Sequence, residues 1–187
     1  MIIPEIFKYN SLISIPLFLF ISLQLVKKVP DFSFSKHTIS KSILFFKSPA
    51  DRIIFKLNFI IKSLLDFGFF LYLVNRFELT YYSSLAWFLF LSIMFFLVLA
   101  YFIEGKFSVI HKVLIYGIGV FWTVCEILLA QLTNAPVFIL FTNLSTVIVL
   151  ILAFGSLFAN KTNVFVQVVC ASIMYLWIGI FVFKFLL

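Results

Sequence analysis

Apolar residues fill most of this chain in long runs, and polar residues interrupt them only at short intervals. Six runs are long enough to cross the ~30 Å hydrocarbon core of a bilayer, which takes about 20 residues of helix. We expect these helices at residues 6–26, 53–74, 82–103, 109–132, 136–158 and 163–187. The pattern therefore predicts an all-α, polytopic membrane protein whose six-transmembrane-helix bundle forms a single transmembrane domain over residues 1–187.

The composition places the chain in a membrane rather than in water. Hydrophobic residues make up 64% of it and charged residues only 11%. A soluble domain of this length has too little interior to hide so much apolar surface. The runs are apolar on every side, whereas the strands of a transmembrane barrel would alternate polar and apolar residues. No small-residue cleavage site follows the first run, so we expect it to be retained as a helix and not removed as a signal peptide.

Basic residues are distributed unequally between the two sides of the expected bundle. Short basic loops stay in the cytoplasm, so we expect the first loop, residues 27–52, inside and both termini outside. The formal net charge of +7 then fits contact with an anionic leaflet better than a nucleic-acid partner. The side of the first, third and fifth loops carries Lys27, Lys28, Lys36, Lys41, Lys47, Arg52, Lys56, Lys106, Lys112 and Lys161, and the other side carries Lys8, Arg76 and Lys184.

The first loop carries an amphipathic pattern of its own. Ile39, Ile43 and Phe46 fall at helical spacing, and lysines lie among them. A short interfacial helix would bury the apolar set and expose the charged one; a plain basic loop against the lipid surface is the alternative. In both cases the anionic headgroups of membrane lipids are the expected partners, and the candidate headgroup contacts are Lys36, His37, Lys41 and Lys47.

Polar residues inside the second predicted helix form a single stripe. Asn58, Lys62 and Asp66 follow one another at intervals of four, which places them on one face of a helix. A charge at the bilayer centre costs at least ~2.5 kcal/mol, so the stripe is expected to face the bundle and Lys62 to pair with Asp66. Two interpretations stay open: an internal link between helices, and a site that handles a proton or a ligand.

Glu126 is the second buried charge, deep in the fourth predicted helix with no basic residue within a helical turn. It must be protonated, meet a partner from another helix, or touch water. Lys62 is the nearest candidate by depth, so we expect a cluster of Glu126, Lys62 and Asp66. The uncharged polar residues of the last two helices are expected to bond across helices, and both cysteines, Cys125 and Cys170, are expected to pack.

Several chemistries lack the residues that they need. The two histidines, His37 and His111, lie near the interfaces, so paired haem ligation is not expected. No HExxH metal motif and no P-loop occurs, and Gly155-Ser156 has no membrane-embedded histidine to activate the serine. We therefore predict no metal and no cofactor, and we favour a protein that is not an enzyme.

Three short motifs carry a family resemblance. Pro30-Asp31-Phe32-Ser33 and His37-Thr38-Ile39-Ser40 follow the first helix, Phe55-Lys56-Leu57-Asn58 begins the second, and Gln167 and Trp177 mark the last. Together they resemble a six-helix prokaryotic membrane family named domain of unknown function 998. The chain departs from that pattern at Asp31, where glycine is usual. The resemblance implies lipid-related work in a prokaryotic plasma membrane, and it transfers no catalytic residues.

Three functions stay open at this point. The first is a bundle that binds lipid or a small amphiphile, or that serves as the accessory subunit of a partner membrane protein. The second is a small proton-coupled transporter that uses Lys62, Asp66 and Glu126. The third is a lipid-modifying membrane enzyme, with His37 near the headgroups and Asp66 as acid or base.

Overall fold

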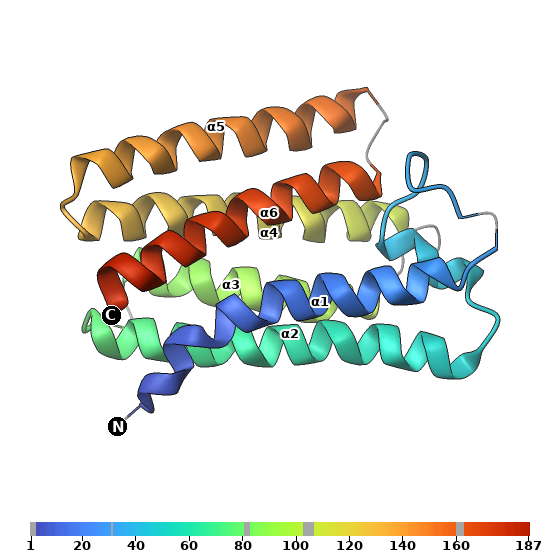
Figure 1. Ribbon diagram of the computed structural model, residues 1–187, viewed down its shortest axis with the longest axis horizontal. Coiled ribbons are helices and arrows are strands. Elements are labelled where there is room, and N and C mark those ends of the chain that lie inside the picture. Colours follow the sequence, from blue (N-terminus) through green and yellow to red (C-terminus); the bar gives the residue numbers. More distant parts are fainter. Residues whose placement is uncertain (1–2, 31, 81–82, 103–106, 160–162) are drawn as a thin grey trace.

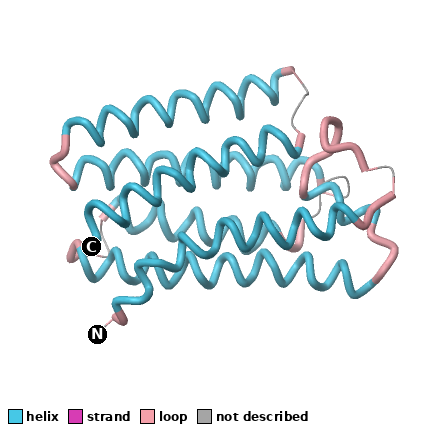
Figure 2. The backbone as a smooth tube through the Cα atoms, viewed as in Figure 1, coloured by secondary structure: helices cyan, strands magenta, loops and turns pink. Residues whose placement is uncertain are grey.

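The computed structural model describes residues 3–30, 32–80, 83–102, 107–159 and 163–187, which form helices joined by loops and turns (Figures 1 and 2). Within these ranges there is no β-strand, as the apolar pattern predicts. Six α-helices follow one another along the chain, and three short helices flank them. They are η1 (Glu5–Tyr9), α1 (Asn10–Lys27), η2 (Ser40–Phe45), α2 (Pro49–Arg76), α3 (Ser84–Leu99), α4 (Ser108–Leu132), α5 (Pro136–Phe158), α6 (Val164–Phe181) and η3 (Val182–Leu186).

Among the described residues, five helical segments are long and apolar enough to cross a membrane, which supports a helical membrane protein. They are Glu5–Lys27, Pro49–Arg76, Val109–Leu132, Pro136–Ser156 and Val164–Leu186. The other apolar helix, α3, has 16 residues, fewer than the ~20 that a full crossing needs. The ends of the predicted third span, at residues 82 and 103, lie outside the described residues, so the count of six crossings stays a prediction.

Each helix packs against the next one along the chain, and α6 packs back against α1. The six helices therefore form a closed ring rather than two flat layers. Figure 1 shows α5 along one edge of the molecule and α2 along the opposite edge. Successive helices run antiparallel (Figure 1), and this arrangement brings the first loop to one end of the ring, here called the loop end (Figure 2).

Two apolar clusters fill the ring, one toward each end. The first gathers Trp177, Phe181 and Phe138 around Leu73 and Leu89. The rings of Trp177 and Phe181 stack with their centroids 5.2 Å apart. The second cluster lies at the loop end, and its buried members come from the first loop, α1, α2, the end of α3, α4 and the start of α6. Between the two clusters the ring is not completely filled.

The first loop corrects one detail of the sequence interpretation. Ile39, Ile43 and Phe46 are only 5%, 4% and 3% exposed, and they pack against α1, α2, α3 and α4 in the second cluster. The short helix that forms in the loop is the 3-10 helix η2, and it buries this apolar set against the protein; its position in the membrane interface stays a prediction. The set is buried in this way because the ends of the helices already offer these side chains an apolar surface, and Leu44 and Phe45 remain exposed.

Two hydrogen bonds attach this loop to α6. The amide of Val164 donates to the carbonyl oxygen of His37 at 2.8 Å, and the amide of Ile39 donates to Oε1 of Gln167 at 2.8 Å. The loop is thus connected to the last helix of the chain although it follows the first. This connection closes the ring at the loop end.

Candidate functional site: an interior cavity beside a buried ion pair

A cavity of about 370 Å³ lies inside the ring of helices. Its wall is mainly apolar, and all six α-helices and the first loop contribute to it. Representative lining residues, one from each helix in order, are Ile15, Phe59, Ile93, Trp122, Val149 and Cys170. A space of this size falls within the range of small-molecule sites, which is about 300–1,000 Å³.

The charged stripe of α2 reaches this cavity through Lys62 and Asp66, which both line it. The ammonium of Lys62 forms an ion pair with Oδ2 of Asp66. The other carboxylate oxygen, Oδ1, accepts hydrogen bonds from the hydroxyls of Ser14 at 2.5 Å and Ser11 at 3.2 Å. Asp66 is 6% exposed, and these three donors compensate its burial.

Asn58 continues the same stripe toward the loop end. Its side-chain amide nitrogen donates to the carbonyl oxygen of Phe18 at 2.9 Å and to the hydroxyl of Ser22 at 3.0 Å. Asn58 and Asp66 therefore both bond to α1. Lys62 between them pairs with Asp66 and lies over the Phe96 ring of α3, so the stripe faces the bundle as expected. The serines of α1 supply the partners, and the sequence interpretation had not identified them.

The ammonium of Lys62 retains capacity to bind. It carries three N–H donors, and its ion pair with Asp66 uses one side of the group. Lys62 Nζ also lies 4.4 Å from the centroid of the Phe96 ring, which lines the same cavity. A ligand oxygen in the cavity would find a donor at Lys62, whereas Asp66 already accepts from three groups.

Glu126 does not join this ion pair, and the expected cluster of Glu126, Lys62 and Asp66 needs correction. Its Oε1 accepts a hydrogen bond from the indole nitrogen of Trp122 at 2.9 Å, and no basic group of the described residues lies within ion-pairing distance of it. The partner stands four residues earlier on the same helix, a spacing visible in the sequence. Glu126 is not among the residues that line the cavity, which it borders only through Trp122.

The loop end of the cavity is polar. Thr38, Ser40, Lys112 and Gln167 line it there. His111, 1% exposed, connects three parts of the chain: Nδ1 lies 2.6 Å from the carbonyl oxygen of Phe102, and Nε2 lies 2.9 Å from the hydroxyl of Ser40. Because a carbonyl can only accept, Nδ1 carries the proton of this pair. His111 thus fixes the start of α4 beside the first loop, which positions Lys112 at the cavity.

The cavity is least closed on the side of α4 and α5. Most lining residues are buried or half-buried, and the exposed ones are Lys112, Gly119, Val120 and Ala153. All four belong to α4 or α5. The rings of Tyr116 on α4 and Phe154 on α5 stack with their centroids 6.1 Å apart. We call this boundary the α4–α5 seam; it is the side from which a membrane molecule would reach the cavity.

The candidate headgroup residues of the first loop lie elsewhere. None of Lys36, His37, Lys41 and Lys47 lines the large cavity. Lys36 and Lys47 are exposed, and Lys41 and His37 are half-buried. The imidazole Nδ1 of His37 accepts from the amide of Ser33 at 3.3 Å. The structure therefore does not gather these four residues around one point.

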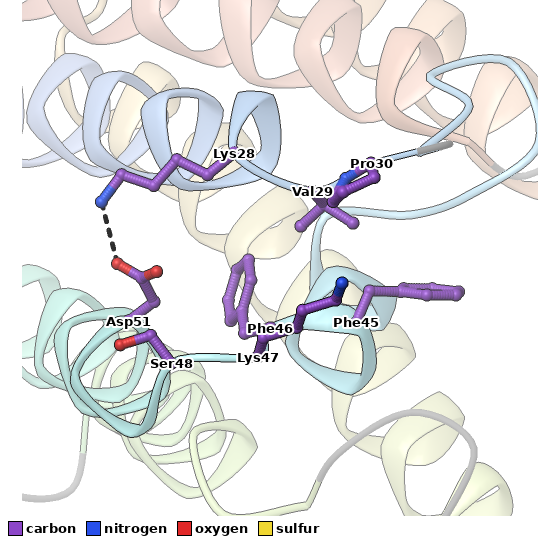
Figure 3. Close-up of a pocket in the computed structure, with 8 residues that line it drawn as sticks. All are labelled: Lys28, Val29, Pro30, Phe45, Phe46, Lys47, Ser48 and Asp51. Atoms are coloured by element: carbon purple, nitrogen blue, oxygen red, sulfur yellow. Dashed lines mark hydrogen bonds and ion pairs between the residues drawn. The ribbon is translucent and has the colours of Figure 1, made fainter.

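Lys47 lines a second, smaller cavity of about 180 Å³ beneath the first loop (Figure 3). There Lys28 forms an ion pair with Asp51 at 2.9 Å. Figure 3 shows the amines of Lys28 and Lys47 on opposite sides of this cavity. Asp51 already neutralises Lys28, so Lys47 is the lysine of this cavity without an ion pair among the described residues.

Metal-binding side chains are scattered in the described part of the chain, where no group of three or more His, Cys, Asp or Glu residues comes together. Cys125 is buried and Cys170 is half-buried in the cavity wall, and both are free thiols. Comparison with protein-family models, with curated proteins and with solved structures finds no match to this chain.

Proposed function

We propose that the protein binds a membrane amphiphile in the cavity that its six helices line. The observation that carries this proposal is the mainly apolar cavity of about 370 Å³, with a charged pair in its wall and polar groups at one end. Ligand sites commonly combine an apolar wall with a few placed polar groups. A hydrocarbon chain with a polar head matches both features.

The physical reason for an apolar occupant lies in packing. Protein interiors are close-packed, and a void lined by side chains such as Ile15, Phe59 and Ile93 forfeits their dispersion contacts. An acyl or alkyl chain restores those contacts. Water in the cavity would need polar groups as hydrogen-bond partners, and these lie mainly at the loop end and near Lys62.

The experiment uses Trp122 as an internal reporter, because its indole lines the cavity. In a Trp87→Phe background, which removes an exposed tryptophan, the protein is placed in nanodiscs of zwitterionic phosphatidylcholine. Brominated stearic acid and brominated stearyl alcohol are then titrated separately. We expect saturable quenching of tryptophan fluorescence by at least one of them, because bromine quenches only at contact.

Trp177 provides the internal control, since it is 1% exposed and does not line the cavity. Its emission should remain when that of Trp122 is quenched. The proposal would be contradicted if, for both probes, quenching does not saturate and rises only in proportion to the bromine content of the bilayer.

A small transporter is the second candidate, and one observation favours it: Lys62 and Asp66 line the cavity as a pair. Protonation of Asp66 would release Lys62 toward a ligand, which is the coupling that a proton-driven carrier needs. Proteoliposomes with an enclosed pH indicator would test this proposal. Ligand-dependent proton flux that Asp66→Asn abolishes would support it, and flux unaffected by that change would contradict it.

We further infer that the loop end faces the cytoplasm. Exposed basic residues gather there, among them Lys27, Lys28, Lys36 and Lys47, and basic loops are retained on the cytoplasmic side. A Lys36→Cys variant tests the orientation through an impermeant maleimide. Labelling only after the cells are permeabilised is the expected result, and labelling of intact cells would reverse the assignment.

A further inference from the structure

The charges in the cavity wall do not balance. Two lysines, Lys62 and Lys112, line it, against one carboxylate, Asp66. Asp66 is occupied by Lys62, Ser11 and Ser14, so it has little capacity left for a cation. A positively charged ligand would meet repulsion from the remaining lysine charge, whereas an anion would meet attraction.

Lys112 is the uncompensated charge. It is exposed, and the described residues place no carboxylate within ion-pairing distance of it. It belongs to the second turn of α4, at the loop end of the cavity. In a membrane-spanning helix this is the depth of the headgroup region, where a lysine can keep its charge in contact with water.

Gln167 supplies a second donor at the same end. The side-chain oxygen Oε1 of Gln167 accepts a hydrogen bond from the backbone amide of Ile39. The side-chain nitrogen Nε2 of Gln167 is therefore left as a donor. The described contacts give this nitrogen no acceptor. An ammonium and an amide N–H₂ at one end of a mainly apolar cavity suit an oxygen anion.

The apolar part of the cavity extends away from these donors. Along α4 its lining runs from Lys112 to Thr123, a distance of about 16 Å at the 1.5 Å rise per residue of a helix. This length suits a hydrocarbon chain rather than a free anion. The volume of about 370 Å³ lies near the lower end of ligand sites, which favours one chain over two.

We propose that the cavity takes a single-chain anionic amphiphile, with its acidic head at Lys112 and Gln167 and its chain along α4 toward Trp122. This inference rests on the proposed function and adds to it the ligand class and the specificity residue. A chain enters through the α4–α5 seam, where the lining residues are exposed.

The test compares brominated stearic acid with brominated stearyl alcohol, which share the chain and differ in the head. Both are titrated into the Trp87→Phe protein in nanodiscs, at an alkaline pH that ionises the acid and keeps lysine charged. We expect the acid to bind about tenfold more tightly, which corresponds to about 1.4 kcal/mol. The Lys112→Gln variant should lose this preference.

Lys36→Gln is the matched control, because Lys36 is an exposed lysine at the same end that does not line the cavity. It removes the same charge from the same side and should keep the tenfold preference. Saturable quenching with equal affinities for acid and alcohol would overturn the anionic class while the proposed function stands. A preference that survives Lys112→Gln would overturn the assignment of the head site.

Two further outcomes separate the remaining sources of failure. Absence of saturable quenching by either probe would overturn the proposed function together with this inference. Excess acetate should leave the binding of the acid unchanged, because the chain supplies most of the contact. Displacement by acetate would show a site for a free carboxylate and overturn the single-chain assignment.

Discussion

The seam between α1 and α2 differs from the α4–α5 seam in how the helices are held. Across the first, Asn58 and Asp66 of α2 bond to the serines and to one carbonyl of α1, and their polar atoms are buried. Across the second, the aromatic rings of Tyr116 and Phe154 stack, and exposed residues of both helices border the cavity. One seam is fixed by hydrogen bonds and the other is apolar and partly open.

This difference assigns separate roles to the two sides of the ring. Lipid chains are as apolar as leucine, so hydrogen bonds and close packing hold membrane helices together. Of the four helices at these seams, α5 buries the smallest share of its most apolar stretch, 22%, against 33% for the segment of α1, 44% for α2 and 39% for α4. We infer that the α1–α2 seam is the scaffold and that the α4–α5 seam is the side that admits a ligand.

The largest effect should follow from removing one partner of the scaffold. Asp66→Ala leaves the Lys62 ammonium without its carboxylate and the hydroxyls of Ser11 and Ser14 without their acceptor. The expected loss in the free energy of unfolding is about 3 kcal/mol. Equilibrium unfolding in mixed micelles measures it.

The double variant Lys62→Met, Asp66→Leu is the control for this prediction. It removes both charges, so no uncompensated ion remains, and it should recover most of the lost stability. Equal destabilisation by the single and double variants would contradict the attribution of the loss to an unpaired Lys62 ammonium.

A smaller effect should follow from added bulk in the same seam. Gly68 of α2 is buried, and a Cβ there would overlap the side-chain amide of Asn10 on α1. Gly68→Leu should therefore cost about 1–3 kcal/mol in the free energy of unfolding. Gly155→Leu on α5, where a Cβ meets nothing within 4 Å, is the matched control and should not destabilise the protein. Similar losses at both positions would remove the contrast between the seams.

The smallest effect should come from the one side-chain hydrogen bond between α5 and α6 that the described residues show. The indole nitrogen of Trp177 donates to the hydroxyl of Thr142 at 2.8 Å. Thr142→Val removes this acceptor and should cost about 1 kcal/mol, measured by the same unfolding experiment. Thr142→Ser keeps the hydroxyl and should stay near the wild type; a loss as large as that of valine would point to packing instead.

The sequence predicted those features that depend on spacing within one helix. Asn58, Lys62 and Asp66 share a face whatever the neighbouring helix is, so their direction was predictable. Their hydrogen-bond partners on α1 could not be predicted, because these partners depend on how α1 is rotated relative to α2. For Glu126 the sequence offered a partner on the same helix, Trp122, which forms the hydrogen bond. The depth of Glu126 in its helix instead led to Lys62 as the expected partner.

The first loop and the cavity show a second limit of sequence reasoning. The pattern identified Ile39, Ile43 and Phe46 as an apolar set, but it does not distinguish lipid from the apolar ends of helices. The cavity is defined by what the side chains of six helices leave unfilled. Gly119 lies on the cavity wall with nothing within 4 Å of an added Cβ.

Gly119 therefore offers the most direct test of the claim that the cavity is the binding site. An added Cβ at Gly119 meets nothing within 4 Å, so Gly119→Leu should place its side chain at the cavity and keep or raise stability, since leucine favours a helix over glycine by about 0.5–1 kcal/mol. Gly155→Leu makes the same change outside the cavity lining. The account predicts that Gly119→Leu abolishes saturable quenching of Trp122 by the brominated amphiphile and that Gly155→Leu leaves it intact. Unchanged quenching in a folded Gly119→Leu protein would contradict it.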